Sequence, residues 1–389
     1  MSNSALSNRN FLIYLCGSTV SLHGLWIYRV ALGWYAWQLT GSELWVGIVA
    51  FTQFAPAVIF GPLFGVLADR FDRRKASILI NSGSVLNMLL LSSLTFLGMV
   101  DITVLAATSL IQGMLDGAHT PVRMTLVPSI VTREQLQSAI ASNSIAFNVS
   151  RFVGPAISGF IIASWGVGTA FAVNSVSYLA IVGAVLLVKV KPRAERSQQS
   201  GDVWSELMDG VRYALSHPTI RALLTTVAMA SVLCRGALEM LPAFADAVFN
   251  GGASALAILT SAVGAGSIAS GLVLARNTRW LSADVVRMAV IAAGFLIVVF
   301  GASDQFWMAV STMVLLGMIL SLVGVGSQIL IQTLVDDDIR GRVSSLWGMI
   351  AFGGTAFGSL IVGSASAAFG LQPTVIVAGL LCAGIAAVL

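Results

Sequence analysis

Long apolar blocks separated by short polar connections are the dominant pattern of this chain. Each block covers about 20 residues or more, the length that an α-helix needs to cross ~30 Å of hydrocarbon. Twelve such blocks are visible, and each is predicted to form a membrane-spanning helix. Their approximate residue ranges are 11–39, 44–67, 76–98, 102–125, 137–163, 168–190, 219–248, 255–275, 284–302, 305–331, 343–368 and 372–389.

Composition supports a membrane protein. Of the 389 residues, 57% are hydrophobic and only 10% are charged, whereas soluble domains carry about a quarter charged residues. The mean hydropathy is +0.90, so a water-soluble protein is excluded. Cys16, Cys234 and Cys382 lie in separate apolar blocks without paired spacing. They are interpreted as packing residues, and no metal site or cofactor is expected.

Basic residues are distributed unevenly between the connections. Of the 21 Lys and Arg residues, 18 lie at the N-terminus or in even-numbered connections, and Arg29, Arg151 and Arg235 lie inside apolar blocks. The positive-inside rule therefore predicts that both termini are cytoplasmic. Because topology explains the net charge of +4, no nucleic-acid partner is expected. The short polar start leads directly into the first block, and we expect no cleavable signal peptide.

One long polar connection divides the chain. We expect an N-terminal six-helix bundle at 1–190, a cytoplasmic linker at 191–218 and a C-terminal six-helix bundle at 219–389. The second part of the linker is predicted to form an amphipathic helix on the membrane surface. Its apolar residues at helical spacing are Trp204, Leu207, Met208, Val211 and Leu215.

The two halves share short sequence matches at nearly constant offsets. Gly159 and Gly166 match Gly363 and Gly370 at an offset of 204 residues. The stretch Arg29-Val-Ala-Leu matches Arg235-Gly-Ala-Leu at an offset of 206 residues. Parallel duplication of a six-helix unit, with a substrate site near the membrane midplane, is known among transporters. The predicted fold is therefore an all-α membrane protein of twelve helices in two pseudo-symmetric six-helix bundles.

A specific motif follows the second block. The stretch from Gly65 to Lys75, GVLADRFDRRK, resembles the loop signature of the major facilitator superfamily, G-x-L-a-D-r-x-G-r-k. The resemblance implies a gating motif at Gly65, Asp69, Arg70 and Arg73 that latches the two halves on the cytoplasmic side. Asp72 stands where the signature has glycine, so the tight turn of the signature is not expected there.

The fifth block carries a second motif. Gly154, Pro155 and Gly159 are similar to the G-P-x-x-G-G motif that the superfamily associates with exporters. Ser158 and Ser150 replace glycines of that pattern, and Ser109 replaces the arginine of the R-x-x-Q-G signature that ends at Gly113. A Gly-Pro kink of purely structural origin is the alternative interpretation.

Further stretches resemble the drug and siderophore exporters of the superfamily, of the enterobactin exporter and macrolide efflux type. They are Ala31–Trp34, Leu39–Ser42, Pro121–Arg123, Leu126–Pro128 and Asp338–Ser345. The resemblance implies a multi-pass protein of the bacterial inner (plasma) membrane. It would export a drug, macrolide or siderophore by alternating access and proton antiport. Uptake or facilitated movement of a metal ion or amino acid, and a non-transporting receptor or scaffold, are the alternatives.

The sequence gives no reason to expect an enzyme. No GxxxxGK[ST] nucleotide loop is present, so transport would be ion-linked or downhill. The expected partners are a small-molecule substrate, protons and membrane lipids, with the chain acting as a monomer.

Ionisable side chains inside membrane segments are costly and point to function. Asp116 and Glu239 are the candidates for proton coupling. The candidates for lining a substrate cavity are His23, Trp26, Arg29, His119 and Arg235. In a second interpretation these charges neutralise one another and fix helix packing, and we assign Arg151 to that structural role. Trp37 is assigned to an aromatic belt at the membrane interface, and no His or Cys spacing supports a metal site.

Overall fold

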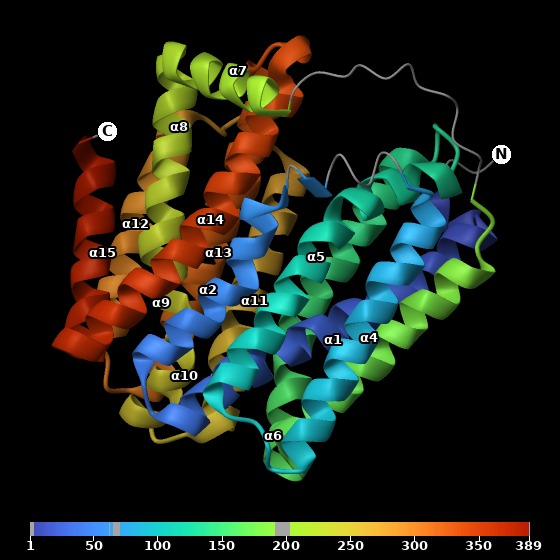
Figure 1. Ribbon diagram of the computed structural model, residues 1–389. Coiled ribbons are helices and arrows are strands. Elements are labelled where there is room, and N and C mark those ends of the chain that lie inside the picture. Colours follow the sequence, from blue (N-terminus) through green and yellow to red (C-terminus); the bar gives the residue numbers. More distant parts are fainter. Residues whose placement is uncertain (1–3, 62, 65–70, 191–202, 389) are drawn as a thin grey trace. The chain divides into compact units, whose positions relative to one another are not determined.

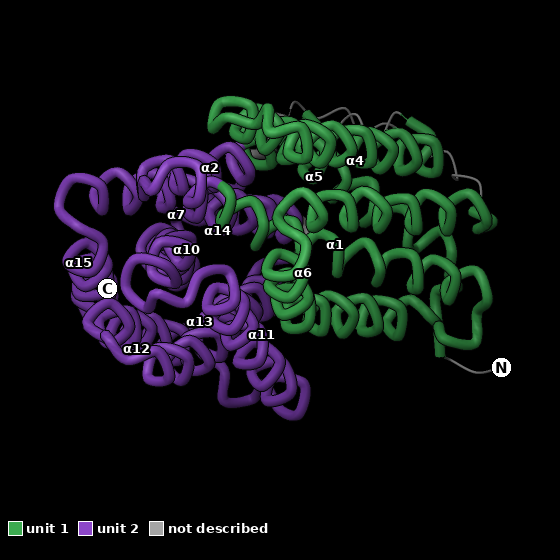
Figure 2. Tube along the Cα trace, turned by 90° about the horizontal axis from the view of Figure 1, so that it is seen from below, with its two compact units in different colours: residues 1–35, 56–198 green, residues 36–55, 199–389 purple. Residues whose placement is uncertain are grey.

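The computed structural model describes residues 4–61, 63–64, 71–190 and 203–388. Regular structure in these ranges is helical throughout, as predicted (Figure 1). The chain separates into two compact units, coloured in Figure 2. Unit 1 contains residues 1–35 and 56–198, and unit 2 contains residues 36–55 and 199–389. Segment 36–55 therefore groups with unit 2, although it precedes most of unit 1 in the sequence.

The described residues of unit 1 include a short 3-10 turn and four long helical elements, besides the end of α2 (Glu43–Ile59). The turn η1 covers Ala5–Ser7, and the helices are α1 (Arg9–Thr40, up to Tyr35 in this unit), α4 (Arg73–Phe96), α5 (Ile102–Ile130) and α6 (Leu136–Leu187). Helix α4 packs against both α5 and α6. Arg74 ties the start of α4 to the end of α6, because its guanidinium donates to the backbone carbonyls of Val185 and Leu186.

Side-chain caps explain where two of these helices begin. Asp72 is the N-cap of α4 and accepts a hydrogen bond from the Lys75 amide at 2.8 Å. Asp101 caps α5 in the same way, accepting from the Val104 amide at 2.8 Å. Hydrogen bonds from the Thr103 hydroxyl and the Val104 amide lower the pKa of the Asp101 carboxyl below its ordinary value. The aspartate at position 72 thus starts a helix, since a capping carboxylate satisfies an otherwise unpaired amide.

Helix α6 consists of two helices that meet at Gly166. Gly166 has φ 79° and ψ 172°, a backbone conformation that is open to almost no residue except glycine. In unit 2, Gly370 joins α14 to α15 with φ 92° and ψ 150°. The glycines matched at an offset of 204 residues therefore adopt the same kind of turn, and the two predicted segments on either side of Gly166 are distinct helices.

Unit 2 contains the remaining elements. They are α2 (Glu43–Ile59, up to Ala55 in this unit), α7 (Val203–Ser216), α8 (Pro218–Met229), η2 (Ala230–Arg235), α9 (Gly236–Leu238), α10 (Leu241–Ala243), η3 (Phe244–Val248), α11 (Gly252–Arg276), α12 (Ala283–Gly301), α13 (Phe306–Leu334), α14 (Asp337–Phe369) and α15 (Leu371–Val388). Helix α12 packs against α13 and α15. This pairing matches that of α4 with α5 and α6, as duplication predicts.

The predicted segment 219–248 is more irregular than its sequence pattern suggested. It runs from α8 to η3, and η2 and η3 are π-helical stretches on either side of two short α-helical turns. Pro242 lies in this region, where its missing N–H removes a helical hydrogen bond. Single π-helical turns inside membrane helices are often found at functional sites.

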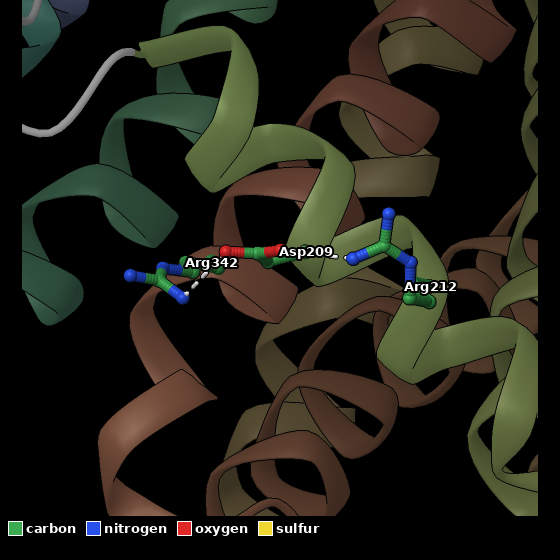
Figure 3. Close-up of polar contacts among 3 residues, drawn as sticks. All are labelled: Asp209, Arg212 and Arg342. Atoms are coloured by element: carbon green, nitrogen blue, oxygen red, sulfur yellow. Dashed lines mark hydrogen bonds and ion pairs between the residues drawn. The ribbon is translucent and has the colours of Figure 1, made fainter.

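Helix α7 crosses the end of α8 instead of continuing it (Figure 1). Asp209 on α7 holds it to the start of α14. One carboxylate oxygen lies 3.1 Å from Arg342, and the other lies 3.4 Å from Arg212 of α7 itself (Figure 3). Tyr213 adds a hydrogen bond of 3.4 Å to Asp336 at the N-cap of α14. Several contacts therefore fix α7 within unit 2.

Within the described ranges, nine helical stretches are long and apolar enough to cross a membrane, and α2 is a shorter apolar helix. Each of the twelve predicted segments coincides with helical residues, the second one only as far as residue 64. Gly65, Asp69 and Arg70 of the predicted gating motif lie outside the described residues. Arg73, the fourth residue of that motif, is the first residue of α4.

Candidate functional site

Asp116 lies midway between the ends of α5 and is held by a buried polar network in unit 1. The Gln112 amide nitrogen, one helical turn earlier, donates to the Asp116 carboxylate at 3.0 Å. The same nitrogen lies 2.9 Å from the Tyr178 hydroxyl of α6 and 3.2 Å from the Ser84 hydroxyl of α4. Asn87 of α4 in turn donates to the Gln112 carbonyl oxygen at 3.2 Å. Three helices thus supply side chains to one network around a single carboxylate.

The number of hydrogens on the Gln112 amide limits how many of its neighbours it can bond at once. The Gln112 amide nitrogen carries two hydrogens, but three acceptor oxygens lie within hydrogen-bonding distance of it. One of the two hydroxyl groups is therefore left to donate its own proton. The Tyr178 hydroxyl lies 3.5 Å from the Asp116 carboxylate and is placed to do so. The Asp116 carboxylate thus has two neighbouring donors, the Gln112 amide and the Tyr178 hydroxyl.

Arg29 of α1 connects Asp116 to an aromatic centre. Its charge acts on the Asp116 carboxylate, and its guanidinium carbon lies 5.0 Å from the centroid of the Trp26 ring. The guanidinium carbon of Arg151 on α6 lies 5.6 Å from the same centroid. Phe147 packs edge-on against Trp26, with 6.0 Å between the ring centroids. Both distances from guanidinium to ring are within the range of cation–π attraction.

Gly154 of the predicted exporter motif lies on the face of α6 that packs on α1. A methyl group built on Gly154 would lie 2.5 Å from the Trp26 Cβ, so only glycine lets the helices approach this closely. Ser158, one turn further along, donates to the Ile27 carbonyl at 2.9 Å. Ser150, one turn before, lies 2.9 Å from the His23 Nδ1 atom. The two serines that depart from the glycine motif therefore hydrogen-bond to α1 on either side of the close contact.

Three sequence candidates of unit 1 thus come together. Trp26, Arg29 and Asp116 are linked through Arg29, and Arg151, assigned to packing from the sequence, contacts the same indole ring. His23 lies one turn before Trp26 on α1. His119 follows Asp116 on α5 near the charge of Arg123. Within the described residues, His119 takes no part in the hydrogen bonds that hold Asp116.

Unit 2 places its charged candidates on one chain segment. Arg235 ends η2, and the charge of Glu239, four residues later, acts on it. A methyl group built on Gly324 of α13 would lie 3.1 Å from an Arg235 nitrogen, so the guanidinium packs closely against that helix. Cys234 and Cys382 are fully buried, and their sulfur atoms are 3.4 Å apart.

Trp37, which the sequence assigned to an interfacial aromatic belt, lies in a buried polar contact. The side chain is buried, and its indole nitrogen donates to the Asp246 carboxylate of η3 at 2.9 Å. Both residues belong to unit 2. This hydrogen bond gives Asp246 a partner in an otherwise apolar segment.

Sequence reasoning missed most of the polar network around Asp116. Ser84, Asn87 and Tyr178 are neutral polar residues in apolar segments and were not singled out, and Gln112 was noted only as the glutamine of the R-x-x-Q-G signature. Their spacing carried a signal, because Ser84 and Asn87 are three residues apart and Gln112 and Asp116 are four apart. Such pairs share one face of a helix. Spacing shows that two residues share a face, but it does not show which other helix that face packs against.

Comparison with known proteins agrees with this architecture. The family model described as transmembrane secretion effector matches residues 2–389. The staphyloferrin A transporter of Staphylococcus aureus (strain NCTC 8325 / PS 47) is 24% identical over 365 residues, covering 92% of this chain and 89% of that protein. Macrolide efflux protein A of Streptococcus pyogenes is 22% identical, covering 86% and 84%. The enterobactin exporter EntS of Shigella flexneri is 23% identical, covering 90% and 83%.

Solved structures show the same fold. The nucleoside transporter NupG superposes with a TM-score of 0.76 at 14% sequence identity, covering 98% of both chains. A bacterial homologue of the human lysosomal transporter Spinster superposes with a TM-score of 0.77 at 13% identity, covering 97% of this chain and 94% of the other. At such low identity the likeness concerns the fold alone.

Proposed function

Because the chain belongs to the transmembrane secretion effector family of the major facilitator superfamily of membrane transporters, we propose that it exports a small organic molecule in exchange for protons. Asp116 takes up and releases the proton in this proposal. The protein is a multi-pass membrane protein with bacterial relatives. Its placement in the inner (plasma) membrane, with both termini in the cytoplasm, is part of the proposal. So are its division at the 191–218 linker and its action as a monomer.

The position of Asp116 carries the proposal. Among the described residues of α1, α4, α5 and α6, it is the one carboxylate inside the helices, and it lies at mid-helix, where a charge is most costly. Gln112, Tyr178 and the charge of Arg29 stabilise the ionised form. Protonation would remove the charge and release these three groups. A change in their contacts is how proton binding would alter the packing of α1, α5 and α6.

The direction of transport is inferred from the relatives and from one motif. Efflux or export is stated in the names of several relatives, including a macrolide efflux protein and an enterobactin exporter. The Gly154 contact between α6 and α1 is the counterpart of the exporter motif in this chain. The gating role of Gly65, Asp69, Arg70 and Arg73 is carried over from the superfamily signature. Glu239 is the second candidate for the coupling carboxylate, since it lies inside a span of unit 2.

Transport assays in inverted membrane vesicles test the proposal. Wild type, Asp116→Asn and Glu239→Gln are compared for accumulation of a cationic dye, a macrolide and a catecholate siderophore, with and without a proton gradient. We expect gradient-driven accumulation of at least one compound by wild type and background levels with Asp116→Asn. The matched control is Asp304→Asn, which removes an exposed carboxylate between α12 and α13 and should leave transport unchanged.

The possible outcomes separate the parts of the proposal. Loss of transport only in Glu239→Gln would move the coupling role to unit 2. Transport that persists in both variants would make both carboxylates structural. Accumulation in right-side-out vesicles instead of inverted vesicles would replace export by uptake. Thermal unfolding of each purified variant distinguishes a lost proton site from a misfolded protein.

A further inference from the structure

Helix α7 is held across the ends of two membrane spans of unit 2. It ends two positions before the span Pro218–Val248 begins. Its Asp209 pairs with Arg342, which lies near the start of the span Ile339–Phe369. A methyl group built on Gly210 would lie 3.2 Å from the Arg342 Cβ, so the backbone of α7 packs directly on α14. Helix α7 therefore lies at a boundary of the membrane, with one side fixed against the protein.

The other side of α7 carries two large apolar side chains with an arginine between them. Met208 is 52% exposed and Leu215 is 60% exposed, and the Arg212 side chain is 76% exposed. Their spacing of four and then three residues places all three on one face of the helix. Gly210 and Ala214 lie on the opposite face and are buried. Helix α7 thus presents a mixed apolar and cationic face on its exposed side.

Arg212 has hydrogen-bond donors to spare on this face. One of its terminal nitrogens lies 3.4 Å from an Asp209 oxygen, but a guanidinium carries five N–H donors. Asp209 lies closer to Arg342, at 3.1 Å, and the two arginines are on opposite sides of its carboxylate (Figure 3). The geometry of a guanidinium suits the oxygens of a phosphate group, which accept parallel hydrogen bonds from it.

A lipid bilayer is the partner that fits such a face. Large apolar side chains gain free energy when they leave water for the acyl chains, and an arginine beside them can extend its charged end to the phosphate layer. Helices that lie in the membrane interface combine these two kinds of contact. Anionic lipids attract basic residues in addition. Because α7 lies at the boundary of the membrane, lipid is also its immediate neighbour.

We propose that the face of α7 formed by Met208, Arg212 and Leu215 binds anionic phospholipid. Arg212 holds the lipid phosphate, and the two apolar side chains insert among the acyl chains. The sequence predicted that α7 lies on the membrane, and its contacts with α14 now select the face that meets the lipid. The inference goes beyond the proposed function, because it depends neither on the substrate nor on the direction of transport.

Hydrogen exchange of the α7 backbone in lipid nanodiscs tests this inference. The full-length protein is reconstituted at one copy per disc, in phosphatidylcholine alone or in a mixture with phosphatidylglycerol. Amide exchange reports how strongly a helix is held, because it requires local opening. We expect α7 to exchange about fivefold more slowly in the mixture, the effect of one basic residue at an anionic surface. Arg212→Gln should remove this difference, and Arg212→Lys should keep part of it.

Two further variants separate the apolar contact from the charge. Met208→Ser combined with Leu215→Ser should speed the exchange of α7 in both lipid compositions, because the helix loses its contact with the acyl chains. Arg276→Gln is the matched control for net charge, since it removes an exposed arginine at the end of α11. It should leave the difference between the two lipid compositions at α7 unchanged. Exchange of α12 and α15 in the same samples verifies that each variant is folded.

Equal exchange of α7 in the two lipid compositions would overturn the inference, as would an unchanged difference in folded Arg212→Gln. Slower exchange in phosphatidylcholine discs after addition of inorganic phosphate would assign Arg212 to a free anion and contradict the lipid assignment. Slower exchange that requires two copies per disc would assign the face to a contact between copies, which also contradicts it. If a variant does not fold, the comparison of lipids and of phosphate on wild type still decides.

Discussion

Each unit has an arginine at the matching position of the repeat, but the two units compensate its charge differently. Arg29 and Arg235 occupy matching positions, but the carboxylate that acts on Arg29 is Asp116 on a neighbouring helix. The carboxylate that acts on Arg235 is Glu239, four residues along the same chain segment. A charge compensated between helices couples their positions, whereas one compensated within a segment does not. In the proposed mechanism, protonation of Asp116 would therefore change helix packing in unit 1.

The residues around the two arginines also differ between the units, because polar side chains in unit 1 correspond to thiols and apolar side chains in unit 2. At the offsets of the repeat, Tyr28 and Tyr178 correspond to Cys234 and Cys382, whose sulfur atoms lie 3.4 Å apart. The counterpart of Asp116 is a leucine, Leu322 or Leu320 depending on the offset used. Unit 2 has thus replaced a polar network by thiols and apolar side chains. The comparison indicates that one half of the repeat keeps the titratable network while the other half is packed like an ordinary core.

The largest effects are expected when the charged residues of each unit are neutralised, first singly and then as a pair. Arg235→Gln and Glu239→Gln should each lower the free energy of unfolding by about 3–5 kcal/mol, because each removes the opposite charge that acts on the other side chain inside the span. The double variant should recover most of that loss, and it should also recover transport. Arg29→Gln with Asp116→Asn should recover stability without transport. Unfolding in mixed micelles and vesicle assays measure the two quantities, and recovered transport in the second pair would erase the distinction between the units.

A smaller effect is expected when the network of unit 1 is made apolar. Gln112→Leu imitates unit 2, where the matching position is Met318 or Leu316. It leaves the hydrogen-bonding groups of Asp116, Ser84 and Asn87 without their amide partner. We expect a loss of about 2 kcal/mol in unfolding free energy, typical of buried unsatisfied groups, together with impaired transport. Met318→Leu is the control and should change neither quantity appreciably.

Both units should respond alike at the glycine turns. Gly166→Ala and Gly370→Ala place a side chain at φ 79° and φ 92°, where L-residues are strained. We expect each to cost about 1–2 kcal/mol and the two costs to agree closely. Gly384→Ala is a suitable control, because a methyl group there meets open space. Thermal unfolding of the three variants measures the difference, and very unequal costs would argue against equivalent turns.

The smallest effects are expected when one heavy atom is removed from Tyr178 or from Cys382, which occupy matching positions in the two halves. Tyr178→Phe removes a hydroxyl that contacts Gln112 and Asp116, at a cost of about 1 kcal/mol. Cys382→Ala removes one buried sulfur, at a cost of about 1 kcal/mol. Stability should therefore change to a similar extent in both. Transport should fall only in Tyr178→Phe, and an equal fall in Cys382→Ala would show that unit 2 takes part in coupling.

The sequence predicted the fold well because its main signals are local. Block length, charge placement and the matched glycines define twelve helices and their duplication without any knowledge of packing. The same signals named Asp116, Arg29 and Trp26, since charges and indoles in apolar segments are conspicuous. Asp72 was harder, because comparison with the signature showed a missing glycine, and the role of the aspartate as a helix cap depends on the backbone geometry of α4.

The remainder of the site depends on which helix faces meet. Gln112 and Tyr178 are ordinary polar residues until α4, α5 and α6 pack together. Arg151 was assigned to packing because it lies close to the Gly154–Pro155 kink in the sequence. Its contact with Trp26 arises only from the approach of α6 to α1. The π-helical stretches η2 and η3 likewise have no periodic signal in a uniformly apolar segment.

The turns at Gly166 and Gly370 also bear on how this chain can evolve. Every single-base change that replaces glycine either adds a side chain or ends translation, so neither position has a neutral amino-acid replacement. The polar residues around Asp116 could be exchanged for leucine and cysteine in the other half while the bundle stayed folded. In most helices, the sequences of the two halves should therefore be free to diverge from each other. Selection against change should be equally strong at these two codons.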